Sequence, residues 1–270
     1  MQLSYKKVLV LGATSGIGRA LASKFVETGT SVIGVGRRKD KLDEFVGEHQ
    51  NDSSGATVDS AVFDITNLEG IPQFAADIFK KHADLDCIFL NSGLQRAVDW
   101  TKPQDVSLET IEMEMLTNYT SYMHLTRAFL PYLQQRAPKE TAMIYTTSGL
   151  ALVPISHCPN YCASKAALHH MILVMREQLR NANSNVKIVE LFPPAVQTEL
   201  HDFEMGEEKG KNVGMPLKEF TEEAFAGLCK VGTEGEQVPV QAVKENFYGW
   251  EMQRQEKMLE MIEMMKKQSH

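Results

Sequence analysis

Short apolar runs alternate with longer amphipathic segments along most of this chain. The apolar runs are rich in valine, isoleucine and leucine and have the length of buried strands. They predict strands at Lys7–Leu11, Ser31–Val35, Ala61–Phe63, Asp86–Leu90, Ala142–Thr147, Val186–Leu191 and Gln237–Val240. Nearly continuous apolar strands with helices between them are typical of a parallel sheet that is covered on both faces.

The segments between these strands have the apolar spacing of helices; Ile17, Leu21 and Phe25, for example, form one stripe. The spacing predicts helices at Gly18–Thr28, Lys39–Glu48, Leu68–His82, Leu108–Leu133, Tyr161–Ala182, Leu217–Lys230 and Glu245–Lys267. We therefore expect one α/β domain over residues 1–270, a doubly wound parallel sheet with helices on both faces. Ligands in such folds bind beyond the carboxyl ends of the strands.

Two segments have a composition of their own. The stretch 199–215 is rich in glycine, glutamate and lysine. A loop of this length in a compact domain is often an active-site lid, so a substrate lid is predicted there. In the final helix, Met258, Met261, Ile262 and Met265 have helical spacing. We expect this stripe to pack on its own domain or on a partner subunit; the alternative is a flexible methionine-lined binding surface.

Composition narrows the function classes. Of the 270 residues, 43% are hydrophobic and 23% are charged, which is ordinary for a globular protein. A net charge of −7 argues against nucleic acid and anionic membranes as main partners. No apolar run has the length of a membrane span, and the first strand begins too early for a signal peptide. A cytoplasmic location is the expectation.

The four cysteines lack the spacing of a disulfide framework, so reduced thiols are expected. Cys158 and Cys162 lie four residues apart, and the sequence places His157, His169 and His170 near them. Because this pair has no second pair of ligands at metal-binding spacing, no metal is expected.

A glycine-rich turn follows the first predicted strand and opens the first helix. Its residues Gly12, Gly16 and Gly18 have the spacing Gly-x-x-x-Gly-x-Gly, which differs from the usual Gly-x-Gly-x-x-Gly. Gly12 permits a tight turn, Gly16 lets the backbone approach a pyrophosphate, and Gly18 allows close packing of helix on sheet. The helix N-terminus offers N–H groups to phosphate. The turn predicts a dinucleotide site; a glycine turn without a ligand is the alternative.

Tyr161 and Lys165 form a second candidate site, together with Ser148 upstream. A spacing of four residues puts the phenol and the ammonium on one face of a helix. The neighbouring cation is expected to lower the pKa of Tyr161 and so to prepare it for proton transfer to a carbonyl. Ser148 would hold the carbonyl oxygen. The alternative is an ordinary surface turn.

Two arginines, Arg37 and Arg38, follow the second predicted strand. A site that prefers NAD would place an acidic residue there for the ribose 2′-hydroxyl, whereas an arginine accommodates the 2′-phosphate of NADP. NADP(H) is therefore the expected cofactor, with Arg37 contributing more than Arg38. Solvated surface arginines are the alternative.

With these residues in place, the chain resembles the single-domain short-chain dehydrogenases/reductases over about residues 7–243, which implies a Rossmann-type fold. Three short segments resemble a narrower branch of oxidoreductases associated with D-alanyl lipoteichoic acid synthesis: Ser148–Ala151, Pro193–Thr198 and Met215–Phe220. Three places depart from the family pattern: Leu11 replaces a Thr, Leu90–Gly93 replaces Asn-Asn-Ala-Gly, and Pro194 replaces a Gly. None of them removes a catalytic atom.

The resemblance implies a role for each catalytic residue. Tyr161 would be the general acid in reduction and the base in oxidation, and Lys165 would lower its pKa and bond the nicotinamide ribose. Ser148 would bind the substrate oxygen. Asn118 would hold a water that links Lys165 to solvent. A homodimer or homotetramer through the helices 108–133 and 161–182 is also implied.

The implied cofactor site extends from the glycine turn to the sixth strand, with Val196 and Thr198 at the nicotinamide and Asp64 and Ile65 around the adenine. It comprises Gly12, Thr14, Ser15, Gly16, Ile17, Gly18, Arg37, Arg38, Asp64, Ile65, Asn91, Gly93, Tyr161, Lys165, Pro193, Val196 and Thr198. The substrate pocket is expected to be mostly apolar. Its lining is Leu94, Gln95, Leu150, His157 and Pro194. A solvated loop histidine is the alternative for His157.

The sequence thus predicts an NADP(H)-dependent oxidoreductase that reduces a ketone or aldehyde, or oxidises the corresponding alcohol. Two alternatives remain open. One is an NADP(H)-binding regulatory or scaffold protein without catalysis, against which the intact set of Asn118, Ser148, Tyr161 and Lys165 argues. The other is reduction of an imine or an activated C=C bond at the same cofactor site.

Overall fold

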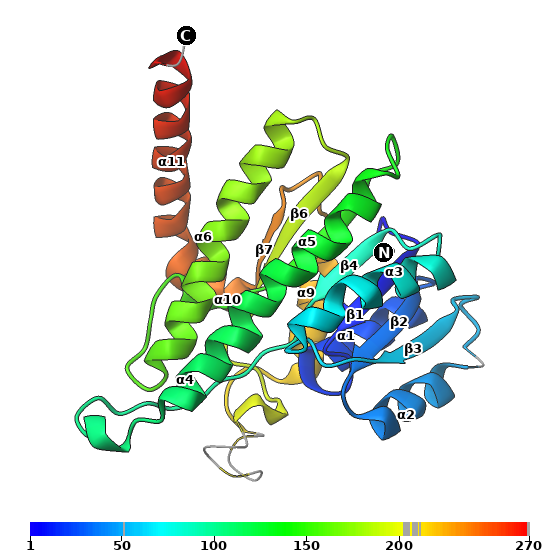
Figure 1. The fold of residues 1–270 in the computed structure, drawn as a ribbon, viewed down its shortest axis with the longest axis horizontal. Helices are drawn as coiled ribbons and strands as arrows, with labels where there is room; N and C mark the ends of the chain where they lie inside the picture. The colour runs from blue at the N-terminus through cyan, green and yellow to red at the C-terminus, as the bar shows by residue number, and fades with distance from the viewer. Residues whose placement is uncertain (51, 202–205, 207–209, 211, 269–270) are drawn as a thin grey trace.

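The computed structural model describes residues 1–50, 52–201, 206, 210 and 212–268. Its centre is a seven-stranded sheet in the order β3-β2-β1-β4-β5-β6-β7, and every neighbouring pair is parallel (Figure 1). The strands are β1 (Lys7–Leu11), β2 (Ser31–Gly36), β3 (Val58–Val62), β4 (Cys87–Leu90), β5 (Thr141–Thr146), β6 (Val186–Phe192) and β7 (Gln237–Pro239). The strand order reverses between β1 and β4, and such a switch point opens a crevice at the carboxyl ends.

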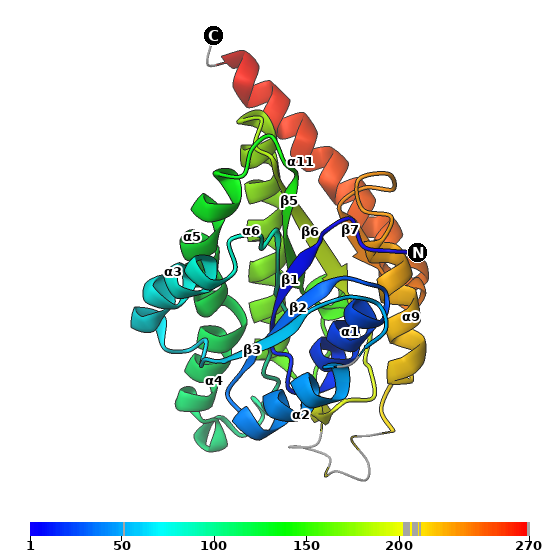
Figure 2. The ribbon, with the colours of Figure 1, turned by 90° about the vertical axis from the view of Figure 1, so that its right-hand side faces the viewer.

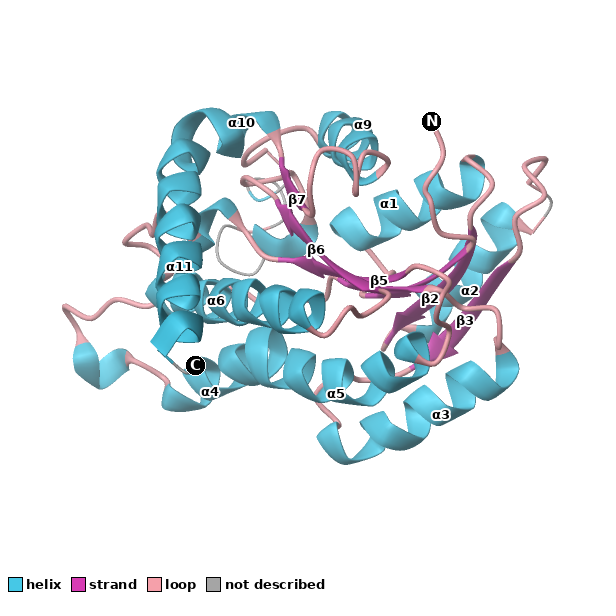
Figure 3. Ribbon diagram, turned by 90° about the horizontal axis from the view of Figure 1, so that it is seen from above, coloured by secondary structure: helices cyan, strands magenta, loops and turns pink. Residues whose placement is uncertain are grey.

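Helices cover both faces of the sheet. Seen end-on, α1, α2 and α9 lie on one side, whereas α3, α5 and α6 lie on the other (Figure 3). The helices are α1 (Gly16–Glu27), α2 (Lys39–His49), α3 (Ile71–Lys81), α4 (Leu108–Met115), α5 (Ser121–Gln134), α6 (Pro159–Asn181), α9 (Leu217–Leu228), α10 (Gln241–Val243) and α11 (Gly249–Gln268). This is the doubly wound, Rossmann-like architecture that the sequence predicts.

The strands are apolar at consecutive positions because both of their faces are buried. Val8 and Val10 of β1 belong to the core under α1 and α9, whereas Leu9 and Leu11 belong to the core under α3, α5 and α6. Successive side chains of a strand point to opposite faces, so one short run supplies both cores. The uninterrupted apolar pattern therefore places β1 at the centre of the molecule.

Two predicted elements differ from the structure. The third strand is Val58–Val62 rather than Ala61–Phe63, because its polar Asp59 and Ser60 lie on an edge strand that is only partly buried. The long helix predicted over 108–133 is divided by a π-helical turn, Leu116–Thr120, into α4 and α5. Apolar spacing cannot reveal such a turn, since the helix continues in nearly the same direction on both sides.

The final helix, predicted over 245–267, consists of a π-helical turn followed by α11, and α11 extends beyond the edge of the sheet (Figure 2). The predicted methionine stripe is divided between two faces. Met258 and Ile262 are half-buried, whereas Met261 and Met265 are 54% and 65% exposed. None of the described helices is both long and apolar enough to cross a membrane.

The predicted lid, 199–215, lies partly outside the described residues, which leave out 202–205, 207–209 and 211. Its two ends are joined by a bridge between Val196 and Met215. The backbone N–H of Gln197 donates to Met215 O at 3.0 Å, and the N–H of Met215 donates to Ala195 O at 2.9 Å. The predicted lid therefore begins and ends beside residues 195–197, which follow β6.

Candidate active site

The glycine turn between β1 and α1 is closely packed. Gly12 and Gly16 have φ of +93° and +55°, a left-handed region that favours glycine. A Cβ at Gly12 would lie 2.9 Å from the backbone N of Ser92, and one at Gly18 would lie 2.1 Å from Gly12 O. A Cβ at Gly16 would lie 3.3 Å from the side chain of Thr198. The turn therefore meets the loops that follow β4 and β6, as a shared cofactor site requires.

The N-terminus of α1 has the chemistry of an anion site. Ser15 occupies the N-cap position and makes no side-chain cap hydrogen bond, and the first turn carries no acidic residue. Arg38 lies beside the turn and donates to Thr14 Oγ1 at 2.9 Å and to Ser15 Oγ at 2.6 Å. Its guanidinium also pairs with Glu199 at 3.1 Å. Helix N–H groups and a nearby arginine together favour a phosphate group.

Arg37 lies apart from the turn. Its side chain is 75% exposed, and its guanidinium lies 3.8 Å from the carboxylate of Asp64. Asp64 accepts hydrogen bonds from the N–H and the hydroxyl of Thr66, at 3.0 and 2.8 Å, which shapes the turn after β3. Ile65 is buried beside it. The predicted adenine residues therefore lie at the carboxyl edge of the sheet, next to an available cation.

The segments that follow β4 and β6 complete this edge. Asn91 Oδ1 accepts a hydrogen bond from Thr146 Oγ1 at 2.9 Å, which joins the ends of β4 and β5. A Cβ on Gly93 would lie 3.9 Å from Lys165 Nζ, so the Gly93 backbone faces α6. Pro193 O accepts a hydrogen bond from the Gly149 N–H at 2.9 Å. Ile17 and Val196 belong to the same core cluster, one partly buried and one buried.

Tyr161 and Ser148 are in direct contact. Ser148 follows β5 and is buried, as is Tyr161 in the first turn of α6. Burial raises the pKa of the Tyr161 phenol above its ordinary value, and the hydrogen bond with Ser148 lowers it by a smaller amount. This contact holds the tyrosine hydroxyl beside the serine hydroxyl. A carbonyl oxygen placed between them would meet two hydroxyl donors.

The expected lowering of the Tyr161 pKa by Lys165 is wrong for this arrangement. Lys165 Nζ lies 5.8 Å from the centre of the Tyr161 ring and donates a hydrogen bond to Thr146 O at 2.9 Å. Burial is therefore the largest influence on the pKa values of both Tyr161 and Lys165. It lowers the pKa of Lys165 to about 8, against the opposing effect of the Glu114 carboxylate.

Asn118 is buried in the π-helical turn, and its side chain is fully engaged. Its Oδ1 accepts from the Leu94 N–H at 2.8 Å, and its Nδ2 donates to Leu94 O at 2.7 Å and to Ser164 Oγ at 3.0 Å. The amide thus ties the loop after β4 to α6. The predicted water relay stays a prediction, because the Asn118 side chain contacts Leu94 and Ser164 rather than Lys165.

Sequence reasoning missed a buried carboxylate in this region. Glu114 is fully buried on α4, four residues before Asn118. It accepts hydrogen bonds from the Arg96 N–H at 3.0 Å and from Asn160 Nδ2 at 2.6 Å. Its position one helical turn from Asn118 is the signal that could have identified it. Its charge raises the pKa of Tyr161, where burial is the larger cause.

The predicted substrate residues differ in their burial and in their contact with Tyr161. Leu150 packs against Tyr161 and its two neighbouring cysteines, and Gln95 is buried, with its backbone oxygen accepting from Arg96 Nη1 at 2.6 Å. Leu94 and Pro194 are half-buried. His157 is exposed, and its backbone oxygen accepts from the Val98 N–H. The apolar substrate pocket stays a prediction.

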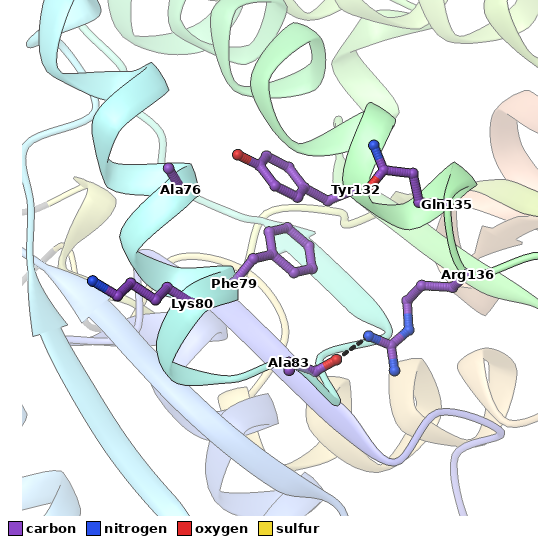
Figure 4. Close-up of a pocket in the computed structure, with 7 residues that line it drawn as sticks. All are labelled: Ala76, Phe79, Lys80, Ala83, Tyr132, Gln135 and Arg136. Atoms are coloured by element: carbon purple, nitrogen blue, oxygen red, sulfur yellow. Dashed lines mark hydrogen bonds between the residues drawn. The ribbon is translucent and has the colours of Figure 1, made fainter.

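A depression of about 460 Å³ lies elsewhere, between α3 and α5 (Figure 4). It is lined by Ala76, Phe79, Lys80, Ala83, Tyr132, Gln135 and Arg136. Phe79 and Tyr132 stack with ring centres 4.5 Å apart, and Arg136 donates a hydrogen bond to Ala83 O (Figure 4). None of the predicted catalytic residues contributes to this depression.

Comparison with known proteins agrees with this geometry. The sequence profile described as short chain dehydrogenase matches residues 6–209. The chain is 31% identical over 229 residues to the uncharacterized oxidoreductase DltE of Bacillus subtilis, which covers 84% of this chain and 86% of that protein. It is also 31% identical over 183 residues to the NADP-dependent 3-hydroxy acid dehydrogenase YdfG of Salmonella typhi, covering 68% of this chain and 70% of that protein.

Solved structures show the same fold. A short chain dehydrogenase/reductase from Burkholderia phymatum in complex with NAD aligns with a TM-score of 0.78 at 18% identity, covering 90% of this chain and 92% of that chain. A short chain dehydrogenase from Burkholderia cenocepacia in complex with NADP aligns with a TM-score of 0.71 at 25% identity, covering 91% and 92%. The aligned structures thus include one with NAD and one with NADP.

Proposed function

Since this chain belongs to the short-chain dehydrogenase family, we propose that it is an NADP(H)-dependent oxidoreductase that interconverts a ketone or aldehyde and the corresponding alcohol. The observation that carries the proposal is the buried contact between Ser148 and Tyr161, with Lys165 one helical turn further along α6. Two hydroxyl groups are thereby held together beyond the carboxyl end of β5.

The residues at this edge fit a nicotinamide dinucleotide. Gly12 and Gly16 have positive φ and pack closely against Ser92 and Thr198, so the loops after β4 and β6 lie beside the N-terminus of α1, whose N–H groups would meet the pyrophosphate. The preference for NADP(H) rests on Arg37 and Arg38, with no acidic residue at the end of β2. The bound cofactor would supply the hydride in reduction and accept it in oxidation.

The chain's own residues would handle the proton. In reduction, the Tyr161 hydroxyl donates its proton to the substrate oxygen while Ser148 donates a hydrogen bond to the same atom. A tyrosine whose pKa is raised by burial keeps its proton at neutral pH, which suits the donor role. Lys165, one helical turn from the tyrosine, would hold the cofactor ribose. Asn118 bonds to the backbone of Leu94 and to Ser164 of α6, so it holds the loop after β4 against that helix.

The substrate we propose is a moderately hydrophobic carbonyl compound, bound by Leu94, Gln95, Leu150, His157 and Pro194. The direct experiment mixes the protein with NADPH and a panel of ketones, aldehydes and imines and follows the absorbance of the reduced nicotinamide. Oxidation of NADPH with a ketone or aldehyde supports the proposal. Turnover of imines alone, or tight NADPH binding without turnover of any compound in the panel, would contradict it.

A further inference from the structure

Two thiols flank the catalytic tyrosine. Cys158 is the N-cap residue of α6, and Cys162 follows Tyr161 in the first turn. Both are buried, with exposed fractions of 0% and 4%. Together with Tyr161 and the packed Leu150, they form a small cluster separate from the main cores. Neither thiol has a part in the proposed hydride transfer, so that reaction does not explain their position.

The two thiols interact with each other. The hydrogen bond from Cys158 is the main cause that lowers the pKa of Cys162 to about 6, while burial opposes it. In its thiol form, Cys162 Sγ donates a weak hydrogen bond to Ile155 O at 3.9 Å, which is lost when the thiol ionises. The N-terminus of a long helix further stabilises a thiolate. Cys162 therefore has thiolate character at neutral pH, and a second thiol lies in contact with it.

The other two cysteines differ in this respect. Burial raises the pKa of Cys87 well above its ordinary value and also raises that of Cys229. Cys229 is nevertheless more exposed than Cys162. Cys229 therefore serves as an internal control. If exposure determines thiol reactivity, Cys229 reacts first; if thiolate character determines it, Cys162 reacts first.

We propose that Cys158 and Cys162 are a reversible oxidation site that forms an intrahelical disulfide with peroxide and thereby displaces Tyr161. The Cys162 thiolate attacks a peroxide oxygen; an S–O bond forms, the O–O bond breaks, and the departing oxygen leaves as water or an alcohol after taking a proton. Cys158 then attacks the sulfenic sulfur; the S–S bond forms, the S–O bond breaks, and a second oxygen leaves as water with the Cys158 proton. Sulfur loses two electrons in total, and the peroxide gains them.

Disulfide formation requires a local movement. Side chains four residues apart on a helix have Cβ atoms about 5–6 Å apart, whereas a disulfide needs roughly 3.5–4.5 Å. Cys158 has φ of −132° and ψ of 65°, so it is already outside the helical conformation and can move. The first turn must close by about 1–2 Å. Tyr161 lies inside that turn, so its contact with Ser148 changes.

The first test uses the unmodified protein and does not depend on its substrate. The protein is treated with hydrogen peroxide, remaining thiols are alkylated, and the peptide that contains both cysteines is analysed by mass spectrometry. We expect loss of two hydrogen masses from this peptide, protection of both thiols from alkylation, and full reversal by dithiothreitol. Prior modification of Cys229, or irreversible oxidation of Cys162 without a disulfide, would overturn the proposal.

The second test compares three variants under the same treatment. Cys158→Ser should accumulate a sulfenic acid at Cys162 that dimedone traps, Cys162→Ser should give no reaction at either position, and the control Cys229→Ser should form the disulfide as the parent does. The rate of Cys162 alkylation should rise through a pH of about 6 in the parent. Disulfide formation in either active-site variant, or a profile for Cys162 that still rises above neutral pH, would contradict the pairing. Because every readout is chemical, these outcomes are independent of the proposed function.

Discussion

Burial is the largest influence on the pKa values of Tyr161 and Lys165. It raises the pKa of Tyr161 and lowers the pKa of Lys165 to about 8, so both groups are pushed towards their neutral forms. The buried Glu114 carboxylate opposes this effect for Lys165. Substitutions in this cluster therefore change proton transfer as well as contacts.

At Tyr161, replacement by phenylalanine removes the proton donor and little else. We expect Tyr161→Phe to keep its affinity for NADPH and to lose turnover by about 100-fold or more, the usual contribution of a general acid. Fluorescence titration measures the first quantity and nicotinamide absorbance the second. Lys165→Ala should weaken both, since in the proposed site Lys165 would also hold the ribose. Activity of Tyr161→Phe within about tenfold of the parent, roughly 1.4 kcal/mol of barrier, would exclude this role.

At the cofactor phosphate, Arg37 is the more available cation because Arg38 is already bonded to Thr14, Ser15 and Glu199. We expect Arg37→Ala to weaken NADPH binding by about 10- to 100-fold, the worth of charge-assisted hydrogen bonds. NADH binding should change little, and Arg38→Ala should have the smaller effect on NADPH. The measurement is a paired titration with both cofactors. Equal affinity of the parent protein for NADH and NADPH would rule out the preference.

At the scale of elements, α6 connects the catalytic site to the last helix. His169 lies two turns after Tyr161 and is fully buried between Glu190 of β6 and Glu251 of α11, at 2.8 and 3.0 Å. Burial opposes the charged imidazole, but the two carboxylates raise the pKa of His169 to about 9. Arg254 also pairs with Glu251, at 2.6 Å, and lies 2.9 Å from the ring of His170. A protonated histidine thus joins three elements.

This cluster predicts a pH dependence of stability. The folded pKa of His169, about 9, exceeds its ordinary value of 6.5, so its contribution is complete below pH 6.5 and is lost as the pH rises through about 9. The difference corresponds to roughly 3 kcal/mol. We expect the melting temperature of the parent to fall over this interval.

The matched variant His169→Gln should have a lower melting temperature than the parent at pH 6.5, because it removes the cation beside the buried Glu190 carboxylate and leaves Glu251 paired with Arg254 alone. Over the same interval its melting temperature should change less than that of the parent. Calorimetry at several pH values measures both curves. Parallel curves for the two proteins would show that His169 does not carry the effect.

At the scale of the molecule, the helices at one side of the sheet leave apolar side chains exposed. Val174 on α6 is 50% exposed, and Leu108 and Met113 on α4 are 65% and 42% exposed. We predict a homodimer or homotetramer that covers these helices. Val174→Glu should shift the protein towards the monomer at micromolar concentration, because the charge would be buried between subunits.

The control for this prediction is Val62→Glu on the edge strand β3, where the valine is 55% exposed. It introduces the same charge at similar exposure, away from the predicted interface, and should leave the assembly unchanged. Light scattering after size-exclusion chromatography gives the masses. A monomeric parent protein, or equal effects of the two substitutions, would contradict an assembly through these helices.

The local pattern of apolar and polar residues is sufficient to predict the order of the strands and helices. Strands buried on both faces must be apolar at consecutive positions, and amphipathic helices must repeat their apolar residues every three to four positions, so both can be recognised without tertiary contacts. The third strand is the exception, because Asp59 and Ser60 at a partly buried edge break the apolar run. The glycine turn was recognisable for a similar reason, since positive φ and close backbone approach select glycine.

Only the tertiary structure decided which groups meet. Glu114 contacts the backbone of Arg96 and the side chain of Asn160, and Glu251 reaches His169 from the far end of the chain. The pKa of Tyr161 follows from how deeply it is buried, which spacing along one helix cannot give. Sequence therefore determined the fold class, because it depends on local periodicity, and it supplied the candidate catalytic side chains through short motifs and a family resemblance. The electrostatics of the site depend on burial and distance between remote segments, and these exist only once the chain has folded.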